Sequence, residues 1–103
     1  MVTLDRMQRT LAFVLDQSAS GHHHLFEAGL IRRAFLERAA AEWRDPDVLS
    51  GADRLLTELQ RAGNLPGQRA VVEEASDPVR RLFVRLYFDY LDGFMHRRGI
   101  NYH

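Results

Sequence analysis

The sequence has 103 residues, of which 46% are hydrophobic and 27% are charged. This composition is typical of one small globular domain, here spanning residues 1–103, and it excludes an intrinsically disordered chain. Fourteen basic and fourteen acidic residues cancel, so no overall positive charge attracts nucleic acid. Cysteine is absent, which excludes disulfides, thiolate metal sites and cysteine nucleophiles.

The N-terminal residues 1–17 carry a charge every few positions and lack the continuous apolar core of a signal peptide. No stretch approaches the run of about eighteen apolar residues that a membrane helix needs. All the basic residues are arginine, a bias typical of GC-rich bacterial genomes. We therefore expect a cytoplasmic bacterial protein without membrane association.

Apolar residues at helical spacing predict helices separated by short breaks, and no stretch alternates as a strand does. The first predicted helix covers residues 3–18, with Phe13 on its polar side. The second begins at residue 23 or 25 and ends at 43, although Gly29 weakens it enough for a start at residue 30. The predicted apolar side of this second helix comprises Ala28, Ile31, Phe35, Leu36, Ala39 and Trp43.

Two further helices are predicted in the middle of the chain. The segment SGAD resembles a capping box with Ser50 as N-cap, which predicts a helix from there to Ala62. Gly63 and the following Asn supply a left-handed stop. Pro66–Gly67 is expected to continue the turn, and residues 68–75 to form a short additional helix.

The last predicted helix, residues 79–98, is unusually apolar and aromatic, with Ser76 or Asp77 as its cap and Pro78 in its first turn. Its apolar arc covers about 240°, against the 100° typical of a surface helix. Such a helix is either central, or packs on its own core on one side and on a partner on the other. The predicted fold is all-α: a small bundle of four main helices plus a short extra helix, with the C-terminal aromatic helix at its centre.

The outer half of this last helix is the predicted interaction surface. Aromatic, apolar helix faces carry binding energy, and a small monomer has little room to surround a helix completely. We therefore expect a small non-catalytic interaction or regulatory module without a cofactor, forming a homodimer or binding another protein. The predicted interface residues are Phe13, Val84, Tyr87, Phe88, Leu91 and Met95.

Three consecutive histidines lie in the segment SASGHHHLFEAG, residues 18–29. The spacing from His23 to Glu27 resembles that in haemerythrin-like di-metal bundles, which have further histidine pairs that this chain lacks. An extended backbone would bring His22 and His24 together, but a closed zinc site needs four ligands. No metal is therefore predicted, and His22, His24 and Glu27 are the candidate ligands. A helix N-terminus beside them disfavours imidazolium, so we expect neutral rings at pH 7 and a poor cationic switch.

Two other functions remain as alternatives. The spacing Arg98-x4-His103 resembles the Arg-x4-6-His motif of HEPN-type ribonucleases, which are all-α and often dimeric. The resemblance implies that Arg98 would polarise a phosphate and that His103 would act on a 2′-hydroxyl. Here Gly99 follows the arginine, where that family usually has a polar residue.

DNA binding is the other alternative. Residues 53–75 can be read as a helix-turn-helix, in which Gln68 and Arg69 begin the recognition helix. Glu73 and Glu74 follow, and their charges oppose DNA phosphates. A plain helix–loop–helix connection is therefore the favoured interpretation of this segment.

Overall fold

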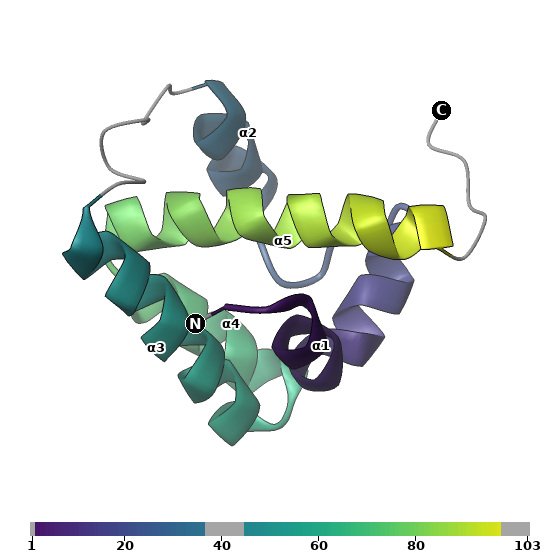
Figure 1. Cartoon of the computed structure of the whole chain (residues 1–103), viewed down its shortest axis with the longest axis horizontal. Helices are drawn as coiled ribbons and strands as arrows, with labels where there is room; N and C mark the ends of the chain where they lie inside the picture. The colour runs from purple at the N-terminus through teal and green to yellow at the C-terminus, as the bar shows by residue number, and fades with distance from the viewer. Residues whose placement is uncertain (1, 37–44, 98–103) are drawn as a thin grey trace.

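The computed structural model describes residues 2–36 and 45–97, and this part of the chain contains five helices and no strand. The helices are α1 (Leu4–Ala19), α2 (Ala28–Leu36), α3 (Pro46–Ala62), α4 (Leu65–Glu74) and α5 (Asp77–Arg97). The predicted all-α bundle, including its short extra helix, is thus confirmed. Figure 1 shows α5 running across the molecule, with α2 on one side and the other three helices on the other side.

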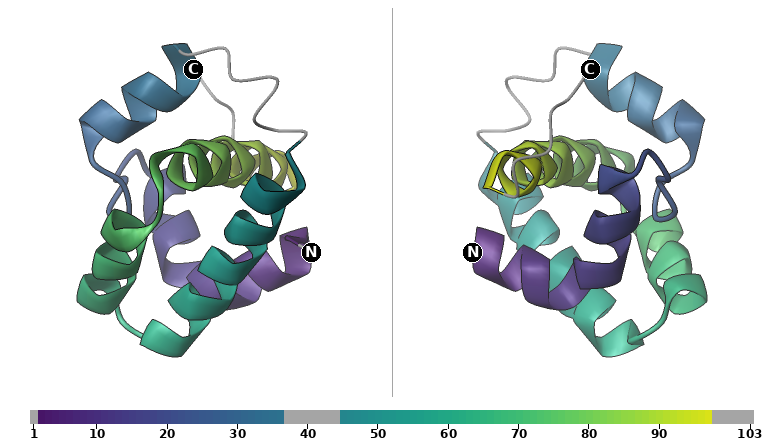
Figure 2. Two further views of the ribbon diagram at one scale, coloured as in Figure 1. Left: turned by 90° about the vertical axis from the view of Figure 1, so that its left-hand side faces the viewer. Right: turned by 90° about the vertical axis from the view of Figure 1, so that its right-hand side faces the viewer.

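The last helix is the centre of the bundle. It packs against α1, α2 and α3, while α4 packs on α3. The views along α5 in Figure 2 show the other helices arranged around it. The buried apolar residues form one cluster, to which α5 contributes Leu82, Phe83, Val84, Tyr87, Leu91 and Met95. The wide apolar arc of α5 is therefore filled largely by the core of the chain itself.

This central position makes most of the predicted interface wrong. The arc that we expected to face a partner instead faces α1 and the core, because the Tyr87 hydroxyl donates a hydrogen bond to the Val14 carbonyl of α1. Among the predicted interface residues, only Phe13 and the half-buried Phe88 reach the surface. The buried ones are Val84, Tyr87, Leu91 and Met95.

The chemistry of the caps explains several helix ends. Thr3 caps α1 by accepting a hydrogen bond from the Arg6 N–H at 3.2 Å. Gly63 ends α3 in the left-handed region, with φ of 71°, as predicted. The side chain of Asn64 then caps α4 by accepting from the Gly67 N–H at 2.8 Å. One glycine and one asparagine thus turn the chain between two packed helices.

Two helices begin earlier than predicted, and each has a proline in its first turn. Asp45 caps α3 and Pro46 occupies its first turn, so Ser50 lies inside the helix and is not its cap. Pro66 likewise lies in the first turn of α4, where we expected a turn. A proline after a capping residue starts a helix, because its missing N–H would lack a helical partner there anyway.

The second helix begins later than predicted, at Ala28. Residues 20–27, here called the histidine loop, precede it, and Leu25 and Phe26 of this loop are buried in the core. These two side chains therefore reach the core from a loop and not from a helix. The predicted end of that helix at residue 43 lies outside the described residues.

The buried side of α2 also differs from the prediction. Leu30 and Ala34 face the core, whereas Phe35 is 47% exposed. The predicted apolar side was chosen to include residues as far as Trp43. The described helix is shorter, and it packs on the core through Leu30 and Ala34. Phe35 is therefore a surface residue.

Candidate functional site

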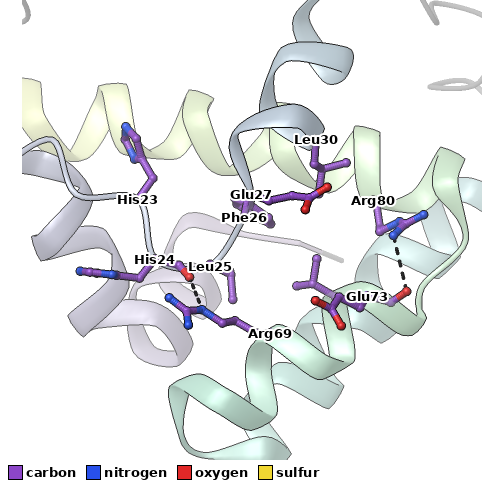
Figure 3. Close-up of a pocket in the computed structure, with 10 residues that line it drawn as sticks. His23, His24, Leu25, Phe26, Glu27, Leu30, Arg69, Glu73 and Arg80 are labelled. Carbon is purple, nitrogen blue, oxygen red and sulfur yellow. Dashed lines mark hydrogen bonds between the residues drawn. The ribbon is translucent and has the colours of Figure 1, made fainter.

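The histidine loop lies beside α1 and α5, and its His23 ring points toward α5 (Figure 3). The ring packs edge-on against Phe88, with 5.1 Å between centroids. Its Nδ1 lies 3.0 Å from the Ser18 hydroxyl, which in turn hydrogen-bonds the Tyr87 hydroxyl. The Tyr87 hydroxyl lies 3.2 Å from the Val14 carbonyl. A chain of polar groups therefore joins the surface loop to the core.

The Ser18–His23 pair has the composition of an activated nucleophile, but its surroundings differ from those of one. In hydrolases a histidine base activates a serine that a substrate carbonyl can reach. Ser18 is only 3% exposed, and its oxygen is already shared by His23 and Tyr87. The pair therefore fixes the loop and offers no attacking oxygen to a substrate.

The environment of His23 favours the neutral ring. Burial of the ring lowers the pKa of His23 below its ordinary value of 6.5, and the neighbouring His22 and His24 lower this pKa further by charge repulsion. His23 is therefore neutral at pH 7, as the sequence suggested. The cause lies in burial and like charge, since α2 begins only at Ala28.

The structure does not bring the candidate metal ligands together. The His22 and His24 rings stack with 6.2 Å between centroids, but His24 and Glu27 point to opposite sides of the loop (Figure 3). Within residues 2–36 and 45–97, no group of three histidine or acidic side chains is arranged to hold a metal ion. The loop is better described by its ring contacts than by its potential ligands.

Aromatic rings continue along the surface on both sides of the loop. On α1, Phe13 stacks on His24 with 6.3 Å between centroids. On the other side, Phe88 contacts Phe35 of α2 at 5.5 Å, and the Arg85 guanidinium lies 4.8 Å from the centre of the Phe35 ring. We call this row the aromatic ridge, and its members are Phe13, His22, His23, His24, Phe35 and Phe88.

The aromatic ridge contains two of the large apolar side chains that are exposed on the described surface. Phe13 is 61% exposed and Phe35 is 47% exposed. The other large apolar side chain exposed in the described residues, Leu49 at 46%, lies on α3. Sequence analysis placed Phe13 on a polar face but missed Phe35, because a helical wheel cannot show which side of α2 the core covers.

A pocket of about 440 Å³ lies under the histidine loop, between α2, α4 and α5 (Figure 3). The Arg69 Nε donates to the His24 carbonyl at 2.6 Å and so ties the loop to α4. Arg80 reaches the Glu73 carbonyl at 3.5 Å. Cationic and anionic side chains alternate around an apolar floor, so the pocket has no excess of either charge. The hydrogen bond from Arg69 holds the loop against α4, and the one from Arg80 joins α5 to α4 at the edge of the pocket.

The two residues that the helix-turn-helix interpretation places at the start of the recognition helix make contacts within the fold. Gln68 is buried, and its amide lies 3.4 Å from the Leu59 carbonyl, to which it donates. Arg69 is engaged with the loop. The exposed side chains later in α4 are acidic, namely Glu73 and Glu74, so the start of α4 does not present the donors expected of a recognition helix.

The ribonuclease-like residues Arg98 and His103 lie outside the described residues. Of the helices described, none combines the length and the hydropathy that a membrane span requires. No protein-family model matches the sequence, and no curated protein or solved structure is significantly similar to it.

Proposed function

We propose that this chain is a small, non-catalytic interaction module that forms a homodimer through the aromatic ridge. The observation that carries this proposal is the row of exposed rings, in which Phe13 and Phe35 are linked through the histidine loop and Phe88. Aromatic residues dominate the binding energy of protein interfaces. Complete burial of one phenylalanine side chain contributes about 1.5–3 kcal/mol, and the partly exposed Phe13 and Phe35 obtain only a fraction of this in the monomer.

The charges beside the ridge support a second copy as the partner. On α5 the half-buried Arg85 precedes Phe88, and the exposed Asp89 and Asp92 follow it. In a two-fold interface each surface meets its own equivalent, so contacts occur in reciprocal pairs. Antiparallel α5 helices would place Arg85 of one copy near the acidic residues of the other, with Phe88 near the axis. The zero net charge adds no long-range repulsion.

Sedimentation equilibrium tests this proposal at micromolar concentration and neutral pH. The wild-type chain is expected to be a dimer, and Phe35→Ser is expected to be a folded monomer, because this surface residue supplies interface area and little core packing. Phe13→Ser provides an independent second variant. Leu49→Ser is the matched control, since it removes an equally exposed apolar side chain on α3 and should leave the dimer intact.

Two results would contradict the proposal. One is a wild-type chain that is monomeric throughout the concentration range. The other is equal dissociation by Leu49→Ser and Phe35→Ser, which would assign the association to general surface hydrophobicity. Far-ultraviolet circular dichroism distinguishes a folded monomer from an unfolded variant.

A further inference from the structure

The proposed dimer surface contains three adjacent imidazoles, and imidazole is the side chain that changes charge between about pH 5 and pH 8. We propose that the histidine loop makes association pH-dependent: neutral rings allow the aromatic ridge to be buried, and protonated rings keep the two copies apart. This inference rests on the proposed homodimer and adds its regulation.

The position of the rings is the first reason. His24 lies between Phe13 and His22 in a continuous stack, and His23 is seated on Phe88. A partner that covers the two exposed phenylalanines therefore also covers the histidines between them. An imidazolium buried without a counter-charge loses its hydration, which disfavours the charged form or the burial itself.

The hydrogen-bond chain behind His23 is the second reason. A proton on Nδ1 can be donated to Ser18, whose hydroxyl then donates to Tyr87, and the Tyr87 hydroxyl to the Val14 carbonyl. With a neutral His23 ring, each of these three donors therefore has an acceptor. A second proton on the ring adds a full charge next to Phe88, and the charged ring makes no additional hydrogen bond with Ser18.

The surrounding charges do not offset such a charge. The charged side chains that line the pocket under the loop together with His23 and His24 are Glu27, Arg69, Glu73 and Arg80. The neighbouring parts of α1 and α5 add Asp16, Arg85 and Asp89. They comprise both signs. Among the described residues, no ion pair joins an acidic side chain to any of the three loop histidines. The pKa of His23 is lowered by burial first and by repulsion from His22 and His24 second, which agrees with the absence of such an ion pair.

The helix ends do not decide the charge state either. The sequence suggested that a helix N-terminus directly follows the histidines and opposes a switch there. In the structure α2 begins only at Ala28, and the loop starts directly after the C-terminal end of α1 at Ala19. The partial charges of these two ends have opposite signs, so the histidine loop can respond to pH.

The expected size of the effect follows from proton linkage. If one imidazole in each copy has to lose its proton before association, the association constant falls about a hundredfold per pH unit well below the pKa of that imidazole. Because the pKa of His23 lies below its ordinary 6.5, the decline sets in only below that pH, and dimerisation should weaken progressively between about pH 8 and about pH 5.

Sedimentation equilibrium of the whole chain across this pH range tests the inference. Wild type is expected to associate at alkaline pH and to dissociate in acid. The triple variant His22→Gln, His23→Gln, His24→Gln should associate at both, since it has no imidazole in the ridge. His96→Gln is the matched control, because it removes an exposed histidine of α5 outside the ridge and should keep the wild-type pH response.

The outcomes separate this inference from the proposed function. Wild-type association that is equal at both ends of the range overturns the pH control and leaves the homodimer standing. A triple variant with the wild-type pH response also overturns it. A wild-type chain that stays monomeric even at alkaline pH overturns the homodimer and the pH control together. Circular dichroism at each pH verifies folding, and the single variant His24→Gln replaces the triple variant if that one unfolds.

Discussion

Substitution of two helical glycines by alanine should have opposite effects on stability. Gly51 lies in α3 where this helix crosses α5, and a Cβ built there would lie 2.5 Å from the Val79 Cγ2 atom. Gly93 lies inside α5, and a Cβ built there would meet no atom within 4 Å. Both replacements remove a glycine from a helix interior, so they differ mainly in what the new methyl group meets.

The magnitude follows from two terms. Alanine is favoured over glycine in a helix interior by about 1 kcal/mol, and this gain applies to both positions. At Gly51 the new carbon lies more than about 1 Å inside ordinary contact distance. Val79 is β-branched and stiff, so relief requires an unfavourable rotamer or a shift of the helix, at about 1–3 kcal/mol. Gly93→Ala should therefore stabilise the protein, and Gly51→Ala should be less stable than Gly93→Ala by about 1–3 kcal/mol.

Urea denaturation followed by circular dichroism measures both free energies of unfolding, at one protein concentration because association would shift them. The double variant Gly51→Ala, Val79→Ala should show a favourable coupling energy, since truncation of Val79 removes the collision. If Gly51→Ala proves as stable as Gly93→Ala, the close contact between α3 and α5 does not limit packing, and the reasoning is refuted.

The remaining predictions concern the polar chain behind the histidine loop. Tyr87→Phe should lower the free energy of unfolding by about 1–2 kcal/mol, because Ser18 loses a buried hydrogen-bond partner. Tyr90→Phe removes a half-buried hydroxyl from the Val2 carbonyl and should lower this free energy by less. The reverse order of the two variants in urea denaturation would contradict the reasoning. The pKa of His23 is lower in the folded chain than its ordinary 6.5, so the unfolded chain takes up the proton first as pH falls. Stability should therefore be complete above about pH 6.5 and decrease below it, and His23→Gln should flatten this part of the pH profile; an unchanged profile in the variant would exclude His23 as its source.

The helix ends show what a sequence can predict. Gly63 acts through groups within a few residues of itself, so local chemistry was enough to predict it as the stop of α3. The starts of α3 and α4 were predicted too late, because a proline can either end a preceding helix or lie in the first turn of a following one. The choice between these roles depends on whether the next residues pack, which the local sequence does not record.

The error about the interaction surface has a different origin. Periodicity established that α5 is apolar over most of its circumference, but it could not show which part of this arc faces α1 or α2. Tyr87 was predicted on the outer side and lies in the core, where its hydroxyl meets Ser18. Phe35 was predicted inside and lies on the aromatic ridge. Such assignments depend on helix rotation, which only tertiary contacts fix.

The contact between His23 and Ser18 left no recognisable signal in the sequence. The two residues are five positions apart across a turn, and Tyr87, the other partner of the Ser18 hydroxyl, lies 69 positions beyond Ser18. Neither the spacing nor the residue types predict that meeting. The three histidines nevertheless stand out in the sequence, where no metal was predicted for them, and the structure places their rings in an aromatic surface.

The central position of α5 affects how the protein is made. This helix is the last of the described elements to leave the ribosome, although α1, α2 and α3 all pack on it. The contact between Tyr90 and Val2 likewise joins residues 88 positions apart. The nascent chain therefore cannot complete this core helix by helix. Its leucine-rich faces stay accessible to chaperones until α5 itself has left the ribosome and can pack against the earlier helices.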